Sequence, residues 1–278
     1  MDNFYIWANR QKDQCEKVTE EIATYLRKNG KKVITDNSER ISVKEIPEDI
    51  QCILVLGGDG TMIRAAHEVL HTKIPMLGIN LGTLGYLAEV EQSQITSALD
   101  HLMKDEYILE ERMMLKGTTP PHTKGAWESV ALNDVVITRM GKLRVLEYKI
   151  YVNGKYLHSY QADGIIVSTP TGSTGYNLSV GGPIVKPSAE LLVITPICAH
   201  TLNSRSIILS GEDHVMIEVG AGRRCEQEQA EVFFDADTSI LLHTGEAIHI
   251  CKAESSVKMI KLSDLSFLEA LGRKLGES

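Results

Sequence analysis

The sequence predicts an α/β domain followed by a mostly β domain, and three observations carry this prediction. The first hundred residues alternate strand and helix patterns, as in a sheet covered by helices. An unbroken apolar run, Cys52–Leu56, ends at Gly57-Gly58-Asp59-Gly60-Thr61, which is typical of a buried parallel strand entering a tight turn. After about residue 112, short β-rich runs separated by turn residues replace this rhythm.

In the first part of the chain, the apolar spacing predicts each element in turn. Strands are predicted at 4–8, 33–35, 52–56 and 76–79, and helices at 11–28, 61–71 and 94–104. The first helix has one apolar face that includes Cys15, Val18 and Ile22, and Gly30 is its stop signal. These elements together predict a Rossmann-like parallel sheet with helices on its faces.

In the second part, strands are predicted at 135–137, 149–152, 165–167, 206–209, 215–219, 232–234 and 247–251. Asn153-Gly154 between two apolar runs predicts a hairpin. We therefore expect an α/β domain of residues 1–112 plus 252–278 and a sandwich-like β domain of residues 113–251. The tail, 262–275, has a helical pattern and is predicted to return to the first domain.

Composition excludes several classes of protein. The chain has 278 residues, 43% of them apolar, which is enough for a sizeable core. Its net charge of -8 argues against a nucleic-acid or anionic-membrane binder, and no apolar run approaches the roughly 20 residues of a membrane span. Five scattered cysteines without a C-x-x-C pair, and an N-terminus lacking a basic region, predict a cytoplasmic protein with reduced thiols.

The glycine turn after the strand at 52–56 predicts an anion site. Its glycines let backbone N–H groups approach a phosphate, and the helix that follows adds its positive end. The carboxylate of Asp59 suits such a site if it takes a proton from an attacking hydroxyl or helps to hold a divalent metal. The alternative is an ordinary strand–turn–helix corner in which Asp59 caps the helix.

A second candidate site runs from Asp163 to Pro183, where an apolar strand leads into many hydroxyls and glycines. Small hydroxyls and free N–H groups at a helix start suit ribose hydroxyls, pyrophosphate oxygens and an adenine edge. Tyr176 is placed to stack on a ring. The alternative is a polar surface loop, in which serine, threonine and glycine are routine.

These blocks resemble those of NAD kinases. The resemblance rests on residues 57–61, 132–137, 163–183 and 196–202, which occur in the family's order. It implies an N-terminal α/β domain, a C-terminal β-sandwich-like domain and a site between them. It further implies transfer of the ATP γ-phosphate to the 2′-hydroxyl of the adenosine ribose of NAD, which gives NADP. A divalent metal, expected to be Mg²⁺, and a homo-oligomer, a tetramer or dimer, are also implied.

The resemblance assigns roles by position. Asp59 becomes the general base, and Gly58, Gly60 and Thr61 line the ATP phosphate site. The residues implied to contact NAD are Asn133, Asp134, Asp163, Thr171, Thr174, Gly175, Tyr176, Ser179 and Tyr86. No residue is assigned as a dedicated metal ligand. For several of these residues the alternative is a purely structural role, such as a turn for Asn133-Asp134 and a core aromatic for Tyr86.

The sequence departs from the family's usual pattern in three places. Gly175 stands where alanine is usual, and Gln161 stands where some members have a basic residue. Asp235-Ala236-Asp237 replaces the Asp-Gly-Gln of many members. None of these departures removes a residue on which the implied chemistry depends.

Three other functions remain as alternatives. His67-Glu68-Val69-Leu70-His71 fits the H-E-x-x-H pattern of zinc hydrolases, but no extended zincin signature follows it. A lipid or sugar kinase shares the glycine–aspartate turn, but the 163–183 block argues against that class. A non-catalytic dinucleotide sensor on the same fold would not need Asp59.

Overall fold

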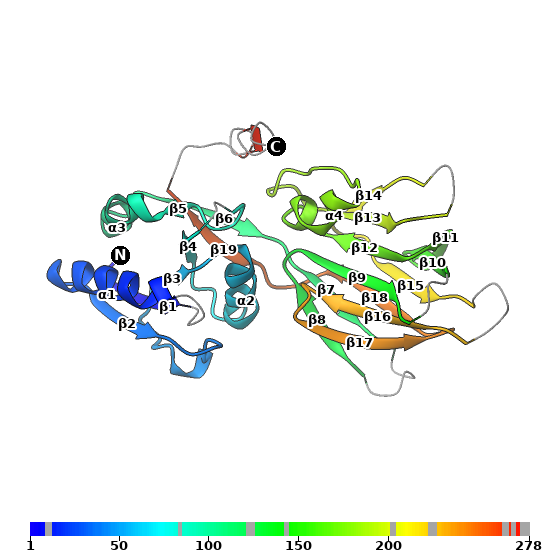
Figure 1. Cartoon of the computed structure of the whole chain (residues 1–278), viewed down its shortest axis with the longest axis horizontal. Helices are drawn as coiled ribbons and strands as arrows, with labels where there is room; N and C mark the ends of the chain where they lie inside the picture. The colour runs from blue at the N-terminus through cyan, green and yellow to red at the C-terminus, as the bar shows by residue number, and fades with distance from the viewer. Residues whose placement is uncertain are drawn as a thin grey trace. The chain divides into compact units, whose positions relative to one another are not determined.

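The structure is a computed structural model that describes residues 1–8, 13–82, 85–120, 126–141, 145–200, 204–221, 227–262, 267 and 271–272 (Figure 1). The chain divides into two compact units. Unit 1 comprises Met1–Arg112 and Ser256–Ser278, and unit 2 comprises Met113–Ser255. The helix predicted at 262–275 lies almost wholly outside the described residues. No helix in the described ranges is both long enough and apolar enough to cross a membrane.

Unit 1 contains a seven-stranded sheet of order β2-β1-β3-β4-β19-β6, with β5 paired to β4. Its strands are β1 Asn3–Ala8, β2 Lys32–Asp36, β3 Cys52–Leu56, β4 Met76–Asn80, β5 Val90–Glu91, β6 Ile108–Arg112 and β19 Val257–Lys261. All pairs are parallel except β19 with β6. The predicted parallel sheet is therefore confirmed, with an antiparallel strand added at one edge.

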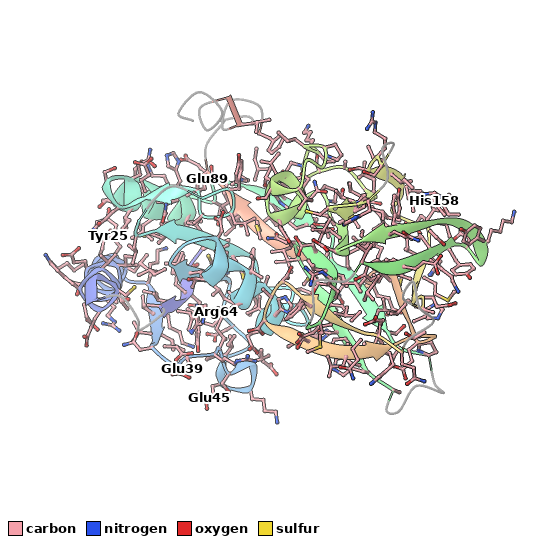
Figure 2. The ribbon with its side chains drawn as sticks, turned by 45° about the vertical axis from the view of Figure 1, so that its right-hand side comes forward. Tyr25, Glu39, Glu45, Arg64, Glu89 and His158 are labelled. Atoms are coloured by element: carbon pink, nitrogen blue, oxygen red, sulfur yellow. The ribbon has the colours of Figure 1, made fainter. Side chains whose placement is uncertain are left out.

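Within the described residues, the α-helices that accompany this sheet are α1 Asp13–Lys28, α2 Asp59–Val69 and α3 Ile95–Met103. The apolar face of α1 shares one buried cluster with α3 and with alternate residues of β3. Tyr25 on α1, labelled in Figure 2, donates a hydrogen bond to Asp100 Oδ1 on α3 at 2.6 Å. Because Gly58 is its N-cap, the helix predicted at 61–71 begins two residues earlier, at Asp59, and it ends two residues earlier, at Val69.

Unit 2 is a sandwich of two six-stranded antiparallel sheets, which confirms the predicted β-rich second part. One sheet has the order β11-β10-β15-β18-β7-β8 and the other β14-β13-β12-β9-β16-β17. Their strands are β7 Leu115–Thr118, β8 Glu128–Ala131, β9 Asp134–Arg139, β10 Leu146–Val152, β11 Lys155–Ala162, β12 Gly164–Ser168, β13 Leu191–Ile197, β14 Ile207–Ser210, β15 Val215–Val219, β16 Gln229–Phe234, β17 Thr238–His243 and β18 Ala247–Lys252. The Asn153-Gly154 hairpin joins β10 to β11, with φ values of 50° and 76°.

The core of unit 2 lies between its two sheets. Val135 and Ile137 of β9 belong to this core with Tyr148 of β10 and Ile165 of β12. Side chains alternate along a strand, so Asp134, Val136 and Thr138 point from the opposite face of β9. That opposite face carries the candidate pocket described below.

Candidate active site

The glycine turn of unit 1 is tight on its inner side and open on its outer side. A Cβ on Gly57 would lie 2.3 Å from Thr61 Oγ1, so only glycine lets the first turn of α2 fold back this closely. A Cβ on Gly58 or on Gly60 would meet no atom within 4 Å. The first N–H groups of a helix have no partner within that helix, so this open side presents donors suited to an anion.

The carboxylate of Asp59, the first residue of α2, binds the loop after β4. Oδ2 accepts a hydrogen bond from Tyr86 N at 2.8 Å. Oδ1 accepts from Leu87 N at 3.0 Å and from Ala88 N at 3.3 Å. Asp59 therefore fixes a neighbouring loop, which differs from the helix-capping role that the sequence left open.

Tyr86 lies beside this carboxylate and is half-buried. Burial, and then the negative charge of Asp59, raise the pKa of the Tyr86 hydroxyl. The hydroxyl consequently stays protonated at neutral pH and can serve as a hydrogen-bond donor.

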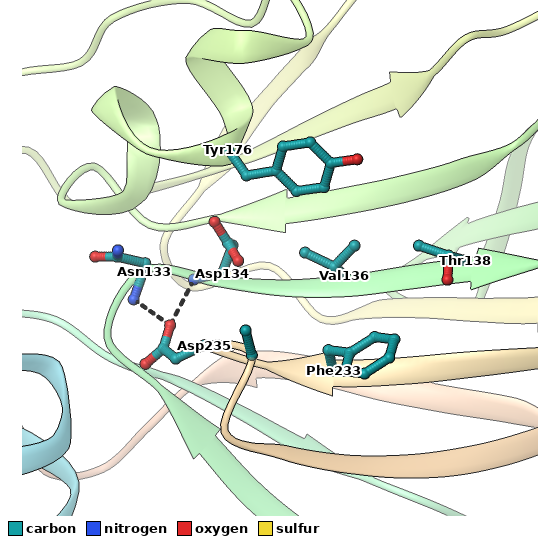
Figure 3. A pocket seen from close by; sticks show the side chains of 8 residues that line it. Asn133, Asp134, Val136, Thr138, Tyr176, Phe233 and Asp235 are labelled. Atoms are coloured by element: carbon teal, nitrogen blue, oxygen red, sulfur yellow. Dashed lines mark hydrogen bonds between the residues drawn. The ribbon is translucent and has the colours of Figure 1, made fainter. Parts of the chain in front are cut away.

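A pocket of about 480 Å³ lies on the outer face of the β9 sheet in unit 2. Figure 3 shows the ring of Tyr176 over the row of side chains that β9 presents. The lining residues are Asn133, Asp134, Val136, Thr138, Tyr176, Phe233, Asp235 and Ala236. Val136 and Phe233 extend an apolar cluster with Ile166 and Ile197, so an apolar floor ends in polar groups, as in many small-molecule sites.

The polar end of the pocket is built around the backbone turn that enters β9. Asp235 Oδ2 accepts a hydrogen bond from Leu132 N at 2.6 Å. Asp235 Oδ1 accepts from Asn133 N at 2.8 Å and from Asp134 N at 3.1 Å, the two bonds drawn in Figure 3. On the other side, Thr169 Oγ1 donates to Leu132 O at 2.6 Å, and Thr169 N donates to Asn133 O at 2.8 Å. The turn is therefore held from two directions.

Asp134 is 7% exposed and lies beside a second carboxylate. Burial, and then the charge of Asp235, raise the pKa of Asp134 to about 7. Near neutral pH its carboxyl group is thus divided between the acid, which can donate a hydrogen bond, and the carboxylate, which can only accept.

The hydroxyl-rich stretch forms two short helical turns, η3 Gly172–Thr174 and α4 Tyr176–Ser179. A Cβ on Gly172 would lie 2.1 Å from Asn133 O, so glycine allows η3 to pack against the 132–134 turn. Ser173 Oγ donates to Pro170 O at 2.7 Å, and the Asn177 side chain bonds Ser173 O and Pro183 O. These two buried side chains hold the stretch in place, which supports Tyr176 at the pocket.

Comparisons with known proteins agree across both units. The ATP-NAD kinase N-terminal domain matches residues 8–107, and the ATP-NAD kinase C-terminal domain matches residues 132–262. The chain belongs to the ATP-NAD kinase family. An NAD kinase of Agathobacter rectalis is 48% identical over 99% of both chains, and one of Lachnoclostridium phytofermentans is 44% identical over 100% of both.

Two solved structures share the fold of this ATP-NAD kinase family member. Yeast NADH kinase complexed with NADH has a TM-score of 0.85 at 23% identity, covering 99% of this chain and 88% of its own. An NAD kinase from Archaeoglobus fulgidus in complex with ATP has a TM-score of 0.77 at 22% identity, covering 98% of both chains. These two structures confirm the predicted fold class, and the family models and relatives above confirm the predicted family.

The site residues expected from the kinase resemblance fall into two groups. Gly58, Asp59, Gly60, Thr61 and Tyr86 gather around the glycine turn in unit 1. In unit 2, Asn133, Asp134 and Tyr176 line one pocket, and a Cβ on Gly175 would lie 3.6 Å from Asn133 Nδ2. Their proposed contacts with ATP and NAD stay predictions.

The remaining expected residues do not line that pocket. Asp163 precedes β12 and pairs through Oδ1 with Arg139 Nε at 2.8 Å. Thr171 is 6% exposed, and Thr174 Oγ1 donates to Thr171 O at 3.4 Å. Ser179 is exposed on α4.

Sequence reasoning gave no role to five residues that line the pocket: Val136, Thr138, Phe233, Asp235 and Ala236. Side chains alternate along a strand, so Val136 and Thr138 share a face of β9 with Asp134, which was already a candidate. This alternation was the signal that identifies Val136 and Thr138. The Asp235 contact joins positions about a hundred residues apart in the sequence, and no local pattern reports it.

The zinc alternative finds no support in the described residues. His71 lies beyond the end of α2, and Glu68 Oε1 lies 3.7 Å from Arg40 Nη1. Among the described residues, no group of three histidine, cysteine, aspartate or glutamate side chains is placed to hold a metal. A catalytic zinc needs three protein ligands, so this chain does not offer a zincin site within the ranges described.

Proposed function

We propose that this chain phosphorylates the 2′-hydroxyl of the adenosine ribose of NAD with ATP, which gives NADP. Family membership over both units supports this reaction. The observation that carries the proposal is the carboxylate of Asp59, held by three N–H groups at the start of a helix whose N-terminus is open.

The donor phosphates are assigned to the turn formed by Gly58, Gly60 and Thr61. The open space outside Gly58 and Gly60 gives room for phosphate oxygens against the N-terminal N–H groups of α2. The positive end of the helix dipole favours the same charge. Thr61 is 7% exposed, packs beneath Gly57 and donates its N–H to Gly58 O at 2.9 Å, so it supports this role by shaping the turn that carries the phosphate site.

Asp59 is assigned as the general base. A carboxylate has about four lone-pair positions, and the three N–H groups use three of them. Oδ2 accepts one bond, from Tyr86 N, and therefore retains capacity for the ribose hydroxyl. The loop contacts fix the orientation of the carboxylate before substrate binds, which is the requirement for efficient proton transfer.

NAD is assigned to the pocket of unit 2. The apolar floor of Val136 and Phe233 with the ring of Tyr176 suits a planar base, and Asn133 and Asp134 suit ribose and pyrophosphate-side groups. The family resemblance supports further NAD contacts by Asp163, Thr171, Thr174, Gly175, Ser179 and Tyr86.

A divalent metal, Mg²⁺, fits this donor set as a partner of the ATP phosphates. Mg²⁺ commonly binds through one or two carboxylates together with substrate phosphates and water, without an all-protein cage. Asp59 is the carboxylate available at the glycine turn. When bound, the metal supplies neutralisation of the charge on the transferred phosphoryl group.

The family resemblance also supports a cytoplasmic homo-oligomer, a tetramer or a dimer. The four described cysteines are free thiols, which suits a reducing compartment. Light scattering coupled to gel filtration measures the oligomer, and a monomer at micromolar concentration would contradict that part of the proposal.

The test is an endpoint assay of the purified chain with ATP, Mg²⁺ and NAD, in which an NADP-specific dehydrogenase detects the product. Wild-type protein should form NADP. Asp59→Asn should lose roughly 10²–10⁴-fold in turnover, the usual contribution of a general base, while NAD still binds. NADP formation at the wild-type rate by Asp59→Asn would remove the general-base role. A folded wild type that binds NAD without forming NADP would indicate a sensor or a different acceptor.

A further inference from the structure

Asp235 contacts the backbone turn that carries Asn133 and Asp134, and no sequence pattern assigned it a role. We infer that Asp235 is a positioning residue of the NAD site: its carboxylate fixes the 132–134 turn so that the side chains of Asn133 and Asp134 face the pocket. This inference rests on the proposed function, since NAD is the ligand whose binding it serves.

The hairpin between β16 and β17 brings Asp235 to this turn. Asp235 and Ala236 have φ values of 49° and 58°, and Asp237 N donates to Phe234 O at 3.0 Å. Two successive left-handed residues closed by this bond form the type I′ hairpin turn. Phe234 is paired with Val135 of β9, so the next residue of the hairpin reaches the start of β9.

Four hydrogen bonds join Asp235 to the turn. Its carboxylate accepts from the N–H groups of Leu132, Asn133 and Asp134, and its own N–H donates to Asp134 O at 3.1 Å. Bonds from N–H groups to a carboxylate are stronger than bonds between neutral groups. The backbone N–H donors of residues 132–134 are thus all engaged by Asp235.

With the backbone satisfied, the side chains are left for the ligand. Asn133 Oδ1 is buried and has no hydrogen-bond partner among the described residues. A buried acceptor of this kind is unfavourable in the empty protein and is satisfied by a donor such as a ribose hydroxyl. Displacing the turn by about 1 Å would misplace this acceptor, and displacements of that size can reduce turnover roughly 100-fold.

Two substitutions remove the carboxylate while suiting the left-handed backbone: Asp235→Asn and Asp235→Gly. The asparagine variant keeps one acceptor oxygen but turns an NH₂ group toward N–H donors. Asp213→Asn is the matched control, because Asp213 Oδ2 also accepts a backbone N–H, that of Ser210 at 2.9 Å, in the exposed turn after β14.

The measurements are KM for NAD, KM for ATP, kcat, thermal unfolding and amide hydrogen exchange of a peptide spanning residues 132–135. Both Asp235 variants should raise KM for NAD about tenfold, the effect of losing one hydrogen bond to a charged group. KM for ATP should change less than about twofold. Exchange should accelerate in the 132–135 peptide, and Asp213→Asn should leave all of these values near those of wild type.

An unchanged KM for NAD with unchanged exchange would overturn the inference. Equal changes in both KM values, together with a general loss of exchange protection, would also overturn it, because Asp235 would then act on stability alone. If wild-type protein forms no NADP, the proposed function fails, but calorimetric NAD binding and hydrogen exchange of the same variants still decide the role of Asp235.

Discussion

Gly85 lies so close to Asp59 that a Cβ atom on residue 85 would come within 1.8 Å of Asp59 Oδ1. This approach lets the next three N–H groups reach the carboxylate. The contact between the candidate base, Asp59, and the loop that orients it therefore requires glycine at position 85.

Gly85→Ala should separate this loop from Asp59. The added methyl group cannot be accommodated without a backbone shift, so stability should fall by about 1–3 kcal/mol and turnover by roughly 100-fold. Steady-state kinetics and urea unfolding measure the two effects. Gly272→Ala is the control, because a Cβ there meets no atom within 4 Å. Wild-type turnover by Gly85→Ala would show that Asp59 does not need the loop.

Tyr176→Ala should weaken NAD binding. The ring is 44% exposed over the pocket, so it is available to a ligand and contributes little to the core. Loss of a stacking ring should raise KM for NAD about 3- to 10-fold. Tyr176→Phe, which keeps the ring, should stay near the wild-type value. Equal effects of the two variants would mean that the hydroxyl, and not the ring, makes the contact.

Asp134→Asn should change how stability depends on pH. Burial, and then the charge of Asp235, raise the pKa of Asp134 in the folded protein from 3.8 to about 7. Between these values the unfolded chain releases a proton that the folded protein keeps, so the stability of the wild type falls as pH rises. Asparagine does not titrate, so Asp134→Asn does not lose this stability as pH rises.

Urea unfolding of both proteins at several pH values measures this difference. From pH 5 to pH 8, the stability of Asp134→Asn relative to wild type should increase by about 2–3 kcal/mol, at 1.36 kcal/mol per pKa unit. A difference independent of pH would show that Asp134 is already ionised at pH 5 in the folded protein.

Ala236→Gly should stabilise the protein. Ala236 has a φ of 58°, a conformation that is unfavourable for a residue with a Cβ and free for glycine. The expected gain is about 0.5–1 kcal/mol, reduced by the greater freedom of glycine in the unfolded chain. Ala189→Gly, at a position without a left-handed φ, should instead destabilise. A loss of stability in Ala236→Gly would mean that the methyl group makes a favourable contact at the pocket.

Local sequence patterns predicted the elements whose signals lie within a few residues. The apolar run at 52–56 is β3 to the residue, and Asn153-Gly154 forms the predicted hairpin. Apolar periodicity and turn-forming residues suffice to predict these two elements, because the conformational preference of each residue agrees with that of its neighbours.

Features that join distant residues escaped these patterns. β19 pairs with β6 across about 150 residues, and Asp235 binds a turn about a hundred residues earlier. The role of Asp59 shows the same limit, since its type and position predicted a carboxylate at an anion site but not the loop that it holds. Such contacts depend on the tertiary fold, which a short window of sequence does not contain.

The place of β19 in the first sheet has a consequence for the order of folding during synthesis. This strand, Val257–Lys261, pairs with both β4 and β6, although more than 140 residues separate it from either. Unit 2, by contrast, is one continuous segment. As the chain leaves the ribosome, unit 2 can form both of its sheets before β19 is synthesised, and until then the edge of β4 that pairs with β19 is unpaired. The domain begun first is therefore finished last, and a nascent chain that stalls before residue 257 carries an open strand edge.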